Sequence, residues 1–276
     1  MCGEVGISVI TYSVPLQTSR KARVPFVLHN SEMTTSQDTI ISSSSTRPRK
    51  EMSAGERRQR WFEVCLVLLV ACGSYIVYSL YLLIAGPSAG PRISRYGWAG
   101  GILQEVTALL LLGYVLSHRG LRFADLGLRW SPRDVAMGLL VTLVSYPAYE
   151  LGHTLVQTIH HLVYGTWATG PTAKDFFPHP SVGAIPFLLL NPFFEELIVR
   201  AYLMTEVLER TGSATLAVVV SIGVQFSYHL CYGWAGAISL SFFKLALALY
   251  YVRSRCALPV IVAHGFFDVY VLLRVW

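Results

Sequence analysis

Residues 61–85 read WFEVCLVLLVACGSYIVYSLYLLIA, a stretch in which Glu63 is the only charged side chain. An α-helix needs about 20 predominantly apolar residues to cross the hydrocarbon core of a bilayer, and this stretch is long enough to do so. Further apolar stretches of similar length follow it, at 97–117, 134–163, 182–208, 214–231, 234–252 and 258–275. The sequence therefore predicts an all-α fold, a polytopic transmembrane helix bundle.

The expected number of membrane spans is about seven, with eight as the alternative. Pro147 lies inside the long third stretch, and Pro186 and Pro192 lie inside the fourth. Proline removes a backbone donor and can kink or end a helix. We therefore expect a kink, a tilt or a division in the third stretch, and a break near one of the two prolines in the fourth.

Composition supports the membrane assignment and excludes other classes of protein. The chain has 276 residues, of which 53% are hydrophobic and 14% are charged, whereas soluble domains carry roughly 25% charged residues. The mean hydropathy is +0.49. The net charge of +6 does not indicate nucleic-acid binding, because the basic residues lie in the N-terminal tail and between the apolar stretches. The five cysteines show no spacing typical of a zinc site.

Residues 1–60 differ from the rest of the chain and have no sustained apolar period. They include the serine run 42–45 and a series of basic residues at Arg47, Arg49, Lys50, Arg57, Arg58 and Arg60. Such a composition cannot bury enough apolar surface to fold. We expect a disordered, basic and serine-rich tail without chemistry of its own.

The tail should be dispensable. Deleting residues 1–52 removes no apolar stretch and keeps Arg57, Arg58 and Arg60, which hold the topology. We expect the shortened protein to insert into membranes and to keep its activity, which membrane fractionation and an activity assay would measure. Failure to insert, or loss of activity, would show that the tail has a function.

The positions of the basic residues predict the topology. Lys and Arg gather in segments that face the cytoplasm in most membrane proteins. With the N-terminus in the cytoplasm, most basic residues near the ends of the stretches lie inside, and few lie outside, namely Arg92, Arg95, Lys174 and Arg274. We therefore expect a cytoplasmic N-terminus and, with seven spans, a C-terminus on the opposite side.

The fourth apolar stretch contains charged residues, which are costly inside a membrane and often functional. Residues 191–200 read NPFFEELIVR. Glu196 and Arg200 are four residues apart, the favourable spacing for an ion pair on one helix face. This pair leaves Glu195 as a carboxylate without a local partner, which suits a general base. The alternative is that all three residues only brace the bundle.

Two further polar groups occupy the fifth and last stretches. His229 follows Gln225 and Phe226 near the end of the fifth stretch, and alone it is typical of a packing residue. In the last stretch, His264 and Asp268 share a helix face at positions i and i+4. Alone, this pair suits a bracing role as well as a functional one.

Other polar residues in the spans have plainer interpretations. Glu150, His153, Gln157 and His160 recur at helical spacing in the third stretch. They indicate a polar seam, with metal binding as the less favoured alternative. Lys244, in the sixth stretch, either extends its ammonium to the membrane surface or neutralises an acid in the core.

Taken together, the three motifs resemble those of a known family. A Glu-Glu-x-x-x-Arg motif, a motif with Phe and His, and a His-x-x-x-Asp motif lie in separate spans. This combination is similar to the CAAX protease and bacteriocin-processing family of intramembrane endopeptidases, which includes the Ras-converting CAAX endopeptidase. The resemblance covers about residues 180–275. It implies three parts: a tail (1–60), N-terminal transmembrane helices (61–178) and a CAAX-protease-like core domain (179–276).

The resemblance also implies roles for individual residues. Glu195 and His264 match the pair that activates the attacking water, His229 and Asp268 match positions that stabilise the oxyanion, and Glu196 and Arg200 match residues that support the site. The chain departs from the family pattern at two positions. Gln225 stands where the family usually has Phe, and Asp268 stands where it usually has Asn.

The second departure leaves two expectations for Asp268. An ionised Asp accepts hydrogen bonds and cannot donate one to an oxyanion, as Asn can. Asp268 either orients His264, as a carboxylate orients an imidazole in other hydrolases, or must be protonated to donate. From the i, i+4 spacing we favour the first.

The sequence thus predicts an intramembrane endopeptidase that hydrolyses a peptide bond with water activated by Glu195 and His264. Its partners would be the lipid bilayer and a peptide or protein with a cleavage site near the membrane, with no nucleic acid. The short loops favour a bacterial plasma-membrane protein. The alternatives are a proton-coupled carrier and a non-catalytic membrane scaffold or bacteriocin-immunity protein.

No cofactor is expected. Zinc is the alternative, and its ligands would be Glu195, His229 and His264. The chain lacks the His-Glu-x-x-His spacing that predicts a zinc protease from sequence.

Overall fold

The computed structural model describes residues 53–85, 97–171, 175 and 184–275. Their secondary structure is helical, and no strand occurs among them, which confirms the all-α expectation. Residues 1–52 of the expected tail lie outside the described residues. Residues 54–60, which were expected to belong to the disordered tail, form the start of helix α1, so the expected tail boundary at residue 60 is wrong. The elements in chain order are α1 (Ala54–Ala85), α2 (Gly97–His118), the 3₁₀ helix η2 (Phe123–Leu126), α3 (Pro132–Tyr164), α5 (Ala184–Glu195), the π helix η3 (Glu196–Tyr202), α6 (Leu203–Thr211), α7 (Ala214–His229), the 3₁₀ helix η4 (Leu230–Tyr232), α8 (Gly233–Ser254) and α9 (Ala257–Val275).

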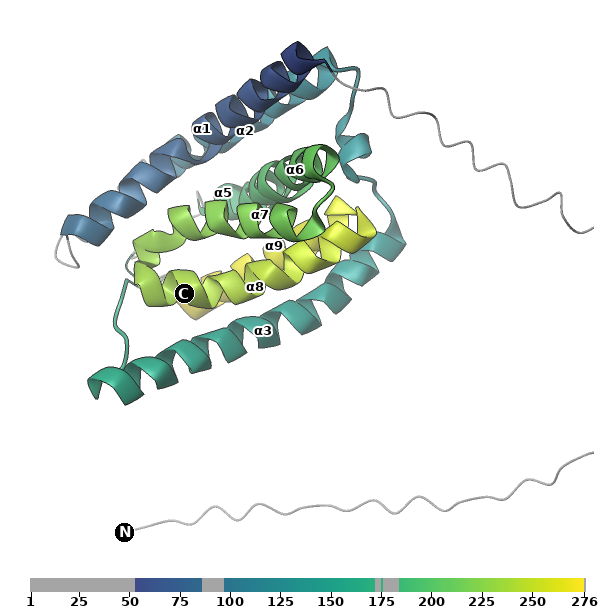
Figure 1. Cartoon of the computed structure of the whole chain (residues 1–276). Coiled ribbons are helices and arrows are strands. Elements are labelled where there is room, and N and C mark those ends of the chain that lie inside the picture. The colour runs from purple at the N-terminus through teal and green to yellow at the C-terminus, as the bar shows by residue number, and fades with distance from the viewer. Residues whose placement is uncertain (1–52, 86–96, 172–174, 176–183, 276) are drawn as a thin grey trace, which may run out of the picture. The chain divides into compact units, whose positions relative to one another are not determined.

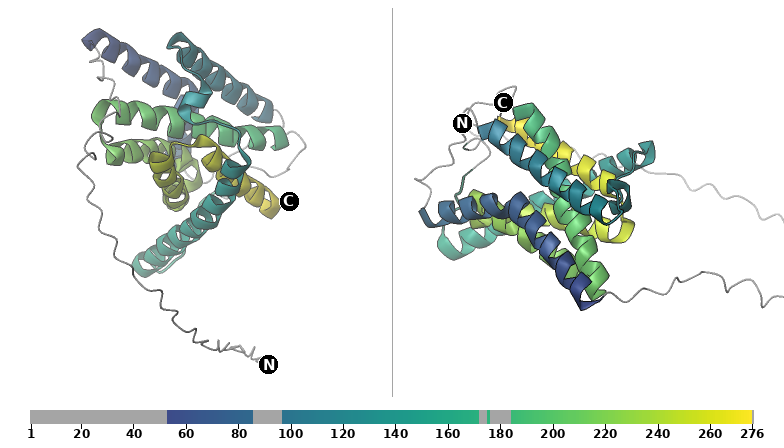
Figure 2. Two further views of the ribbon diagram at one scale, coloured as in Figure 1. Left: turned by 90° about the vertical axis from the view of Figure 1, so that its right-hand side faces the viewer. Right: turned by 90° about the horizontal axis from the view of Figure 1, so that it is seen from above.

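The helices from Met52 onward form three layers (Figure 1). Helices α1 and α2 lie side by side on one face and pack against α7 and α5. Helix α3 covers the opposite face and packs against α8 and α9. The middle layer therefore holds the segment from α5 to α9, as the two turned views also show (Figure 2).

Five helical stretches of the described residues are long and apolar enough to cross a membrane. They are Ala54–Ala85, Gly97–His118, Pro132–Tyr164, Ala214–Ser254 and Ala257–Arg274. Each of the seven expected stretches contains a helix, but seven or eight crossings are not confirmed. One reason is that α7 and α8, joined by η4, count as a single stretch although they pack against each other.

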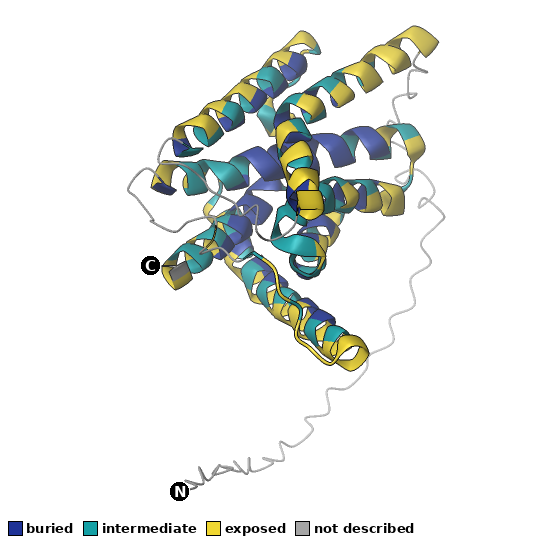
Figure 3. Ribbon diagram, turned by 90° about the vertical axis from the view of Figure 1, so that its left-hand side faces the viewer, coloured by how far each residue is buried: buried dark blue, intermediate teal, exposed yellow. Residues whose placement is uncertain are grey.

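The outward faces of the outer helices are apolar. Leu69 of α1, Leu110 of α2 and Leu143 of α3 are 68%, 70% and 71% exposed. Figure 3 shows the buried residues concentrated in the middle layer and the exposed ones on the outer helices. Exposed apolar surface on this scale is unusual for a soluble monomer and suits contact with acyl chains.

The segment α5–η3–α6 is the centre of the bundle. Every residue from Phe194 to Met204 is buried, so this helix is surrounded by protein on all sides. Such a helix buries its charged residues among other helices. It therefore places the acidic motif inside the molecule.

The prolines do not break the helices where the sequence allowed a break. Helix α3 runs continuously through Pro147, and α5 continues through Pro192. Proline cannot donate a hydrogen bond to the carbonyl four residues earlier. Four residues after Pro192, at Glu196, the helix widens to π geometry. Such wide turns are frequent at functional sites.

Three arginines tie the helix ends together at one end of the bundle. Arg119, just after α2, pairs with Glu63 of α1 and Glu206 of α6. Arg60 of α1 and Arg210 of α6 also contact Glu206, at 3.1 and 2.7 Å. We call Arg60, Arg119 and Arg210 the arginine cluster. Its ion pairs bring the first turns of α1 and the last turns of α2 and α6 to the same end.

Candidate functional site

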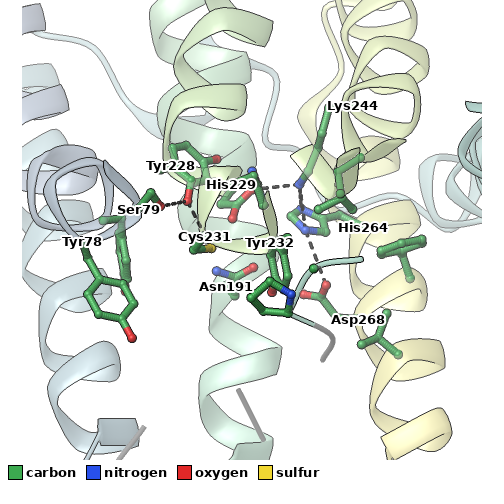
Figure 4. Close-up of a pocket in the computed structure, with 18 of the residues that line it drawn as sticks. Tyr78, Ser79, Asn191, Tyr228, His229, Cys231, Tyr232, Lys244, His264 and Asp268 are labelled. Atoms are coloured by element: carbon green, nitrogen blue, oxygen red, sulfur yellow. Dashed lines mark hydrogen bonds and ion pairs between the residues drawn. The ribbon is translucent and has the colours of Figure 1, made fainter. Parts of the chain in front are cut away.

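A cavity of about 750 Å³ lies between the layers, and all four residues expected to be catalytic line it. Glu195 comes from α5, His229 from α7, and His264 and Asp268 from α9. Figure 4 shows His229, Lys244, His264 and Asp268 grouped together, with Asn191 nearby. With Lys244 of α8, the structure thus brings side chains from α5, α7, α8 and α9 to one place.

Lys244 of α8 is the main partner of Glu195. Its Nζ lies 2.8 Å from Oε2 of Glu195 and 3.7 Å from Oε1 of Glu196. The residue is 2% exposed, so its ammonium neutralises acids in the core and does not reach the membrane surface. Glu195 was expected to have no local partner, and its partner indeed comes from another helix, as in the second expectation for Lys244.

His264 is oriented by Glu196. Its Nδ1 lies 3.0 Å from Oε1 of Glu196, and its Nε2 lies 2.9 Å from Nζ of Lys244. Nζ of Lys244 also lies 3.3 Å from Nδ1. An ammonium can only donate, so the ring nitrogen that it contacts accepts. Oδ1 of Asp268 is 3.6 Å from Nε2, which is longer than a hydrogen bond.

Asp268 therefore lies beside His264 as its spacing favoured, at ion-pair distance and without a hydrogen bond to the ring. Its Oδ2 is buried and has no hydrogen-bond partner among the described residues. The carboxylate within hydrogen-bond distance of the His264 ring is that of Glu196. Glu196 reaches it from the central helix, which spacing along α9 could not indicate.

Arg200 is fully buried and makes the predicted pair with Glu196, with Nε 3.3 Å from Oε2. Its guanidinium also donates to the side chains of Ser221 and Gln225 and, at 2.9 Å, to the carbonyl of Lys244. Gln225 in turn donates from Nε2 to Oε2 of Glu195 at 3.3 Å. Gln225 thus links Arg200 to Glu195, which a Phe side chain could not do.

His229 ends α7 and is fixed by its own helix. Its Nδ1 lies 2.8 Å from the backbone carbonyl of Gln225. A carbonyl oxygen can only accept, so Nδ1 carries a proton and Nε2 is the ring nitrogen that a bound molecule would meet.

Residues 177–270 match the family model described as type II CAAX prenyl endopeptidase Rce1-like. We call this part of the chain the Rce1-like domain, after the model that it matches. It contains Glu195, His229, Lys244, His264 and Asp268, so the resemblance inferred from the three motifs is confirmed. No curated protein and no solved structure matches the chain.

One wall of the cavity comes from helices that precede the Rce1-like domain. Glu105 of α2 is fully buried, and its Oε1 accepts a hydrogen bond from Nδ2 of Asn191 at 3.0 Å. Asn191 lines the cavity one helical turn before Glu195. Neither residue had a predicted role. Glu105 is the one acidic residue of its apolar stretch, and this position could have marked it as a candidate functional residue.

The polar seam of α3 holds a loop at the cavity. Gln157 exchanges two hydrogen bonds with the backbone of Ala168, at 2.9 and 3.2 Å. Nδ1 of His160 lies 2.7 Å from the carbonyl of Thr166. The loop residues 168–171 line the cavity. The seam therefore has a structural role at the edge of the Rce1-like domain, and its residues form no metal-ligating group in the described part of the chain.

Side chains that could hold a metal do gather at the site. Ligand atoms of Glu195, Glu196 and His264 lie within 4.8 Å of one another, and all three residues are buried. This group contains Glu196 where the sequence analysis named His229. The ammonium of Lys244 contacts all three residues, which bears directly on whether a metal can share the site.

Proposed function

We propose that this protein is an intramembrane endopeptidase that hydrolyses a peptide bond with water activated by Glu195 and His264. The observation that carries the proposal is the convergence of Glu195, His229, His264 and Asp268 on one cavity. This cavity lies in an Rce1-like domain, within a chain that has helices long enough to cross a membrane.

The geometry supports a defined role for each oxygen of Glu195. Lys244 and Gln225 both contact Oε2, which leaves Oε1 for the attacking water. In the proposed reaction, Oε1 removes a proton from the water as the water attacks the scissile carbonyl. Glu195 then gives this proton to the leaving nitrogen as the C–N bond breaks, which releases an amine and a new carboxylate. His264 assists through the ammonium of Lys244, which contacts both its ring and Oε2 of Glu195. No covalent intermediate with the enzyme is needed.

The negative charge that develops on the carbonyl oxygen needs hydrogen-bond donors. Nδ1 of His229 already donates to the carbonyl of Gln225, so Nε2 can donate to the oxyanion only when the ring carries a second proton. Asn191 has a side-chain amide in the same cavity. One N–H of this amide donates to Glu105, and the second N–H is left for a bound molecule. We assign the oxyanion to His229, with Asp268 or Asn191 as the second group.

Asp268→Asn should preserve cleavage or raise it. Glu196 already holds the ring of His264, so the carboxylate of Asp268 is not needed for orientation, and an amide adds a donor facing the cavity. We expect wild-type activity to fall as the pH rises and Asp268 loses its proton, and this loss to be absent in the variant. Profiles of rate against pH for the two proteins measure this. A strong loss of activity in the variant at all pH values would instead assign the orienting role to Asp268.

The substrate class that we propose is a membrane-anchored peptide with a prenylated C-terminal CAAX sequence, because the matching family is described as a prenyl endopeptidase. The cavity walls include Trp98, Tyr149 and Phe187, which suit a lipid-modified chain. A purified sample should release the C-terminal residues from a farnesylated peptide and act more slowly on the same peptide without farnesyl. The variant Leu143→Ala changes an exposed side chain on the outer face of α3, away from the cavity. It should cleave both peptides at the wild-type rates.

The rival functions give different results in the same experiment. A proton-coupled carrier would leave the peptide intact and would move protons across the membrane of a sealed vesicle. A scaffold or immunity protein would do neither. Cleavage of the peptide without farnesyl alone would keep the endopeptidase and remove the prenylated substrate.

We further propose that the N-terminal end of α1 is cytoplasmic, as the basic residues favour. The arginine cluster marks one end of the bundle, and α3 connects that end with the loop 165–171 at the cavity. Helix α3 has 33 residues, about 50 Å of helix at 1.5 Å per residue. The cavity then lies toward the side away from the cytoplasm.

Cysteine labelling tests this topology. In a background without the native cysteines, Thr169→Cys and Ala124→Cys place single thiols at exposed positions near opposite ends of α3. We expect a membrane-impermeant maleimide to label intact cells at position 169 and not at position 124, with both labelled after lysis. The reverse pattern would place the cavity on the cytoplasmic side.

A further inference from the structure

We infer that the ammonium of Lys244 is the resident cation of the acidic site, and that removing it uncovers a divalent-cation site made of Glu195, Glu196 and His264. Lysine and metal would then be mutually exclusive occupants of one position. The metal-binding part of this inference depends only on the geometry of the cluster. The consequence for catalysis, that wild-type cleavage needs no metal, rests on the proposed function.

The position of Nζ of Lys244 is close to all three side chains of the acidic site. It lies 2.8 Å from Oε2 of Glu195, 2.9 Å from Nε2 of His264 and 3.7 Å from Oε1 of Glu196. Zinc binds such ligands at about 2.0–2.2 Å. Shifts of less than about 1 Å by Glu195 and His264 would therefore convert their contacts with Nζ into ligand distances.

The contacts of the His264 ring also suit a cation at this position. Nζ of Lys244 lies 2.9 Å from Nε2 and 3.3 Å from Nδ1 of the ring, and Nδ1 lies 3.0 Å from Oε1 of Glu196. An ammonium can only donate, so the ring nitrogen that it contacts presents a lone pair. Histidine nitrogens and carboxylate oxygens are also the ligands that zinc takes in proteins. Here the lysine ammonium stands where the ion would be.

The charges of the cluster are balanced by its own side chains. Glu196 is paired with Arg200 on one side, and Glu195 is paired with Lys244 on the other. Two buried acids are thus matched by two buried bases. A divalent ion added beside Lys244 would place like charges about 3 Å apart, which is strongly unfavourable where water is excluded. The wild-type cluster therefore does not suit a metal, whereas the cluster without Lys244 requires a cation or protons.

Lys244 is also held in place by its surroundings. Its backbone carbonyl accepts a hydrogen bond from Arg200 at 2.9 Å, so the arginine that pairs with Glu196 also fixes the turn of α8 that carries the lysine. The side chain is buried and has no route to the membrane surface. The ammonium is a fixed part of the site.

Zinc content and thermal unfolding of the purified protein in detergent test the inference without any peptide substrate. The wild type should hold no stoichiometric zinc after dialysis against micromolar zinc, and its midpoint should not move. Lys244→Met, which is similar in length and uncharged, should bind one zinc per chain and melt at a higher temperature with zinc. Lys244→Met combined with His264→Ala should lose that zinc.

Lys244→Gln is the second variant, because its amide can contact the same partners if Lys244→Met does not fold. Zinc bound stoichiometrically by the wild type and lost in His264→Ala would overturn the inference. Failure of both Lys244 variants to bind zinc, whether they are folded or unfolded, would also overturn it. Because zinc content is the readout, these outcomes are independent of whether the protein cleaves the farnesylated peptide.

Discussion

Glu195→Gln is expected to lower the rate of peptide cleavage by a factor of about 10²–10⁴, the range that general-base catalysis contributes. The amide has nearly the same shape and can still accept a hydrogen bond from Lys244, but it cannot take a proton from water. The variant should therefore remain folded and inserted. Steady-state cleavage by equal amounts of folded protein gives the comparison.

Glu209→Gln is the matched control for this variant. Glu209 lies on α6, is about half exposed and pairs with Arg60 at 2.9 Å, so the same chemical change occurs away from the cavity. We expect its cleavage rate to equal that of the wild type. Unchanged cleavage in Glu195→Gln, or an equal loss in both variants, would contradict the role given to Glu195.

Arg200→Ala is expected to have the largest effect on stability. Arg200 is fully buried and contacts Glu196, Ser221, Gln225 and the carbonyl of Lys244. Removing one partner of a buried ion pair costs about 3–5 kcal/mol, because the other charge is left uncompensated. We expect a much lower yield of folded protein and a lower unfolding midpoint in detergent, with activity lost in proportion.

Two further variants separate charge from geometry at this position. Arg200→Lys keeps the charge but not the planar fork of donors, so its stability should lie between those of wild type and Arg200→Ala. Arg253→Ala removes an exposed arginine at the end of α8 and should change stability little. An Arg200→Ala protein as stable as Arg253→Ala would show that the central charge network does not hold the bundle together.

Local spacing predicted those parts of the site that lie within one helix. The Glu196–Arg200 pair is four residues apart, and the structure has it at 3.3 Å. The same rule placed Asp268 beside His264, and the structure has the two at 3.6 Å, but Glu196 of the central helix comes closer to the ring, at 3.0 Å. Spacing along one helix carries no information about a competing carboxylate from another.

Partners distant in the sequence were beyond reach for the same reason. Lys244 is 49 residues from Glu195, and Asn191 is 86 residues from Glu105. A single sequence shows that a buried lysine needs an acid, but packing decides which acid it meets. The π helix at Glu196 was also not predicted, since no residue type marks it apart from Pro192 before it.

The helices themselves were readable because long apolar stretches have few alternatives. The number of crossings was harder, since length and hydropathy describe a helix and not its surroundings. The segment α5–η3–α6 illustrates this. It was expected to span the membrane like the other stretches, yet it is enclosed by protein from Phe194 to Met204.

The most direct test of the central claim is mass spectrometry of a farnesylated CAAX peptide after incubation with the purified protein in water enriched in ¹⁸O. Wild-type protein should release the C-terminal fragment and place one ¹⁸O atom in the new carboxylate of the remaining peptide, and Glu195→Gln should leave the peptide intact. An intact peptide with the wild type, or the same labelled product with Glu195→Gln at the same rate, would contradict hydrolysis by water activated at Glu195.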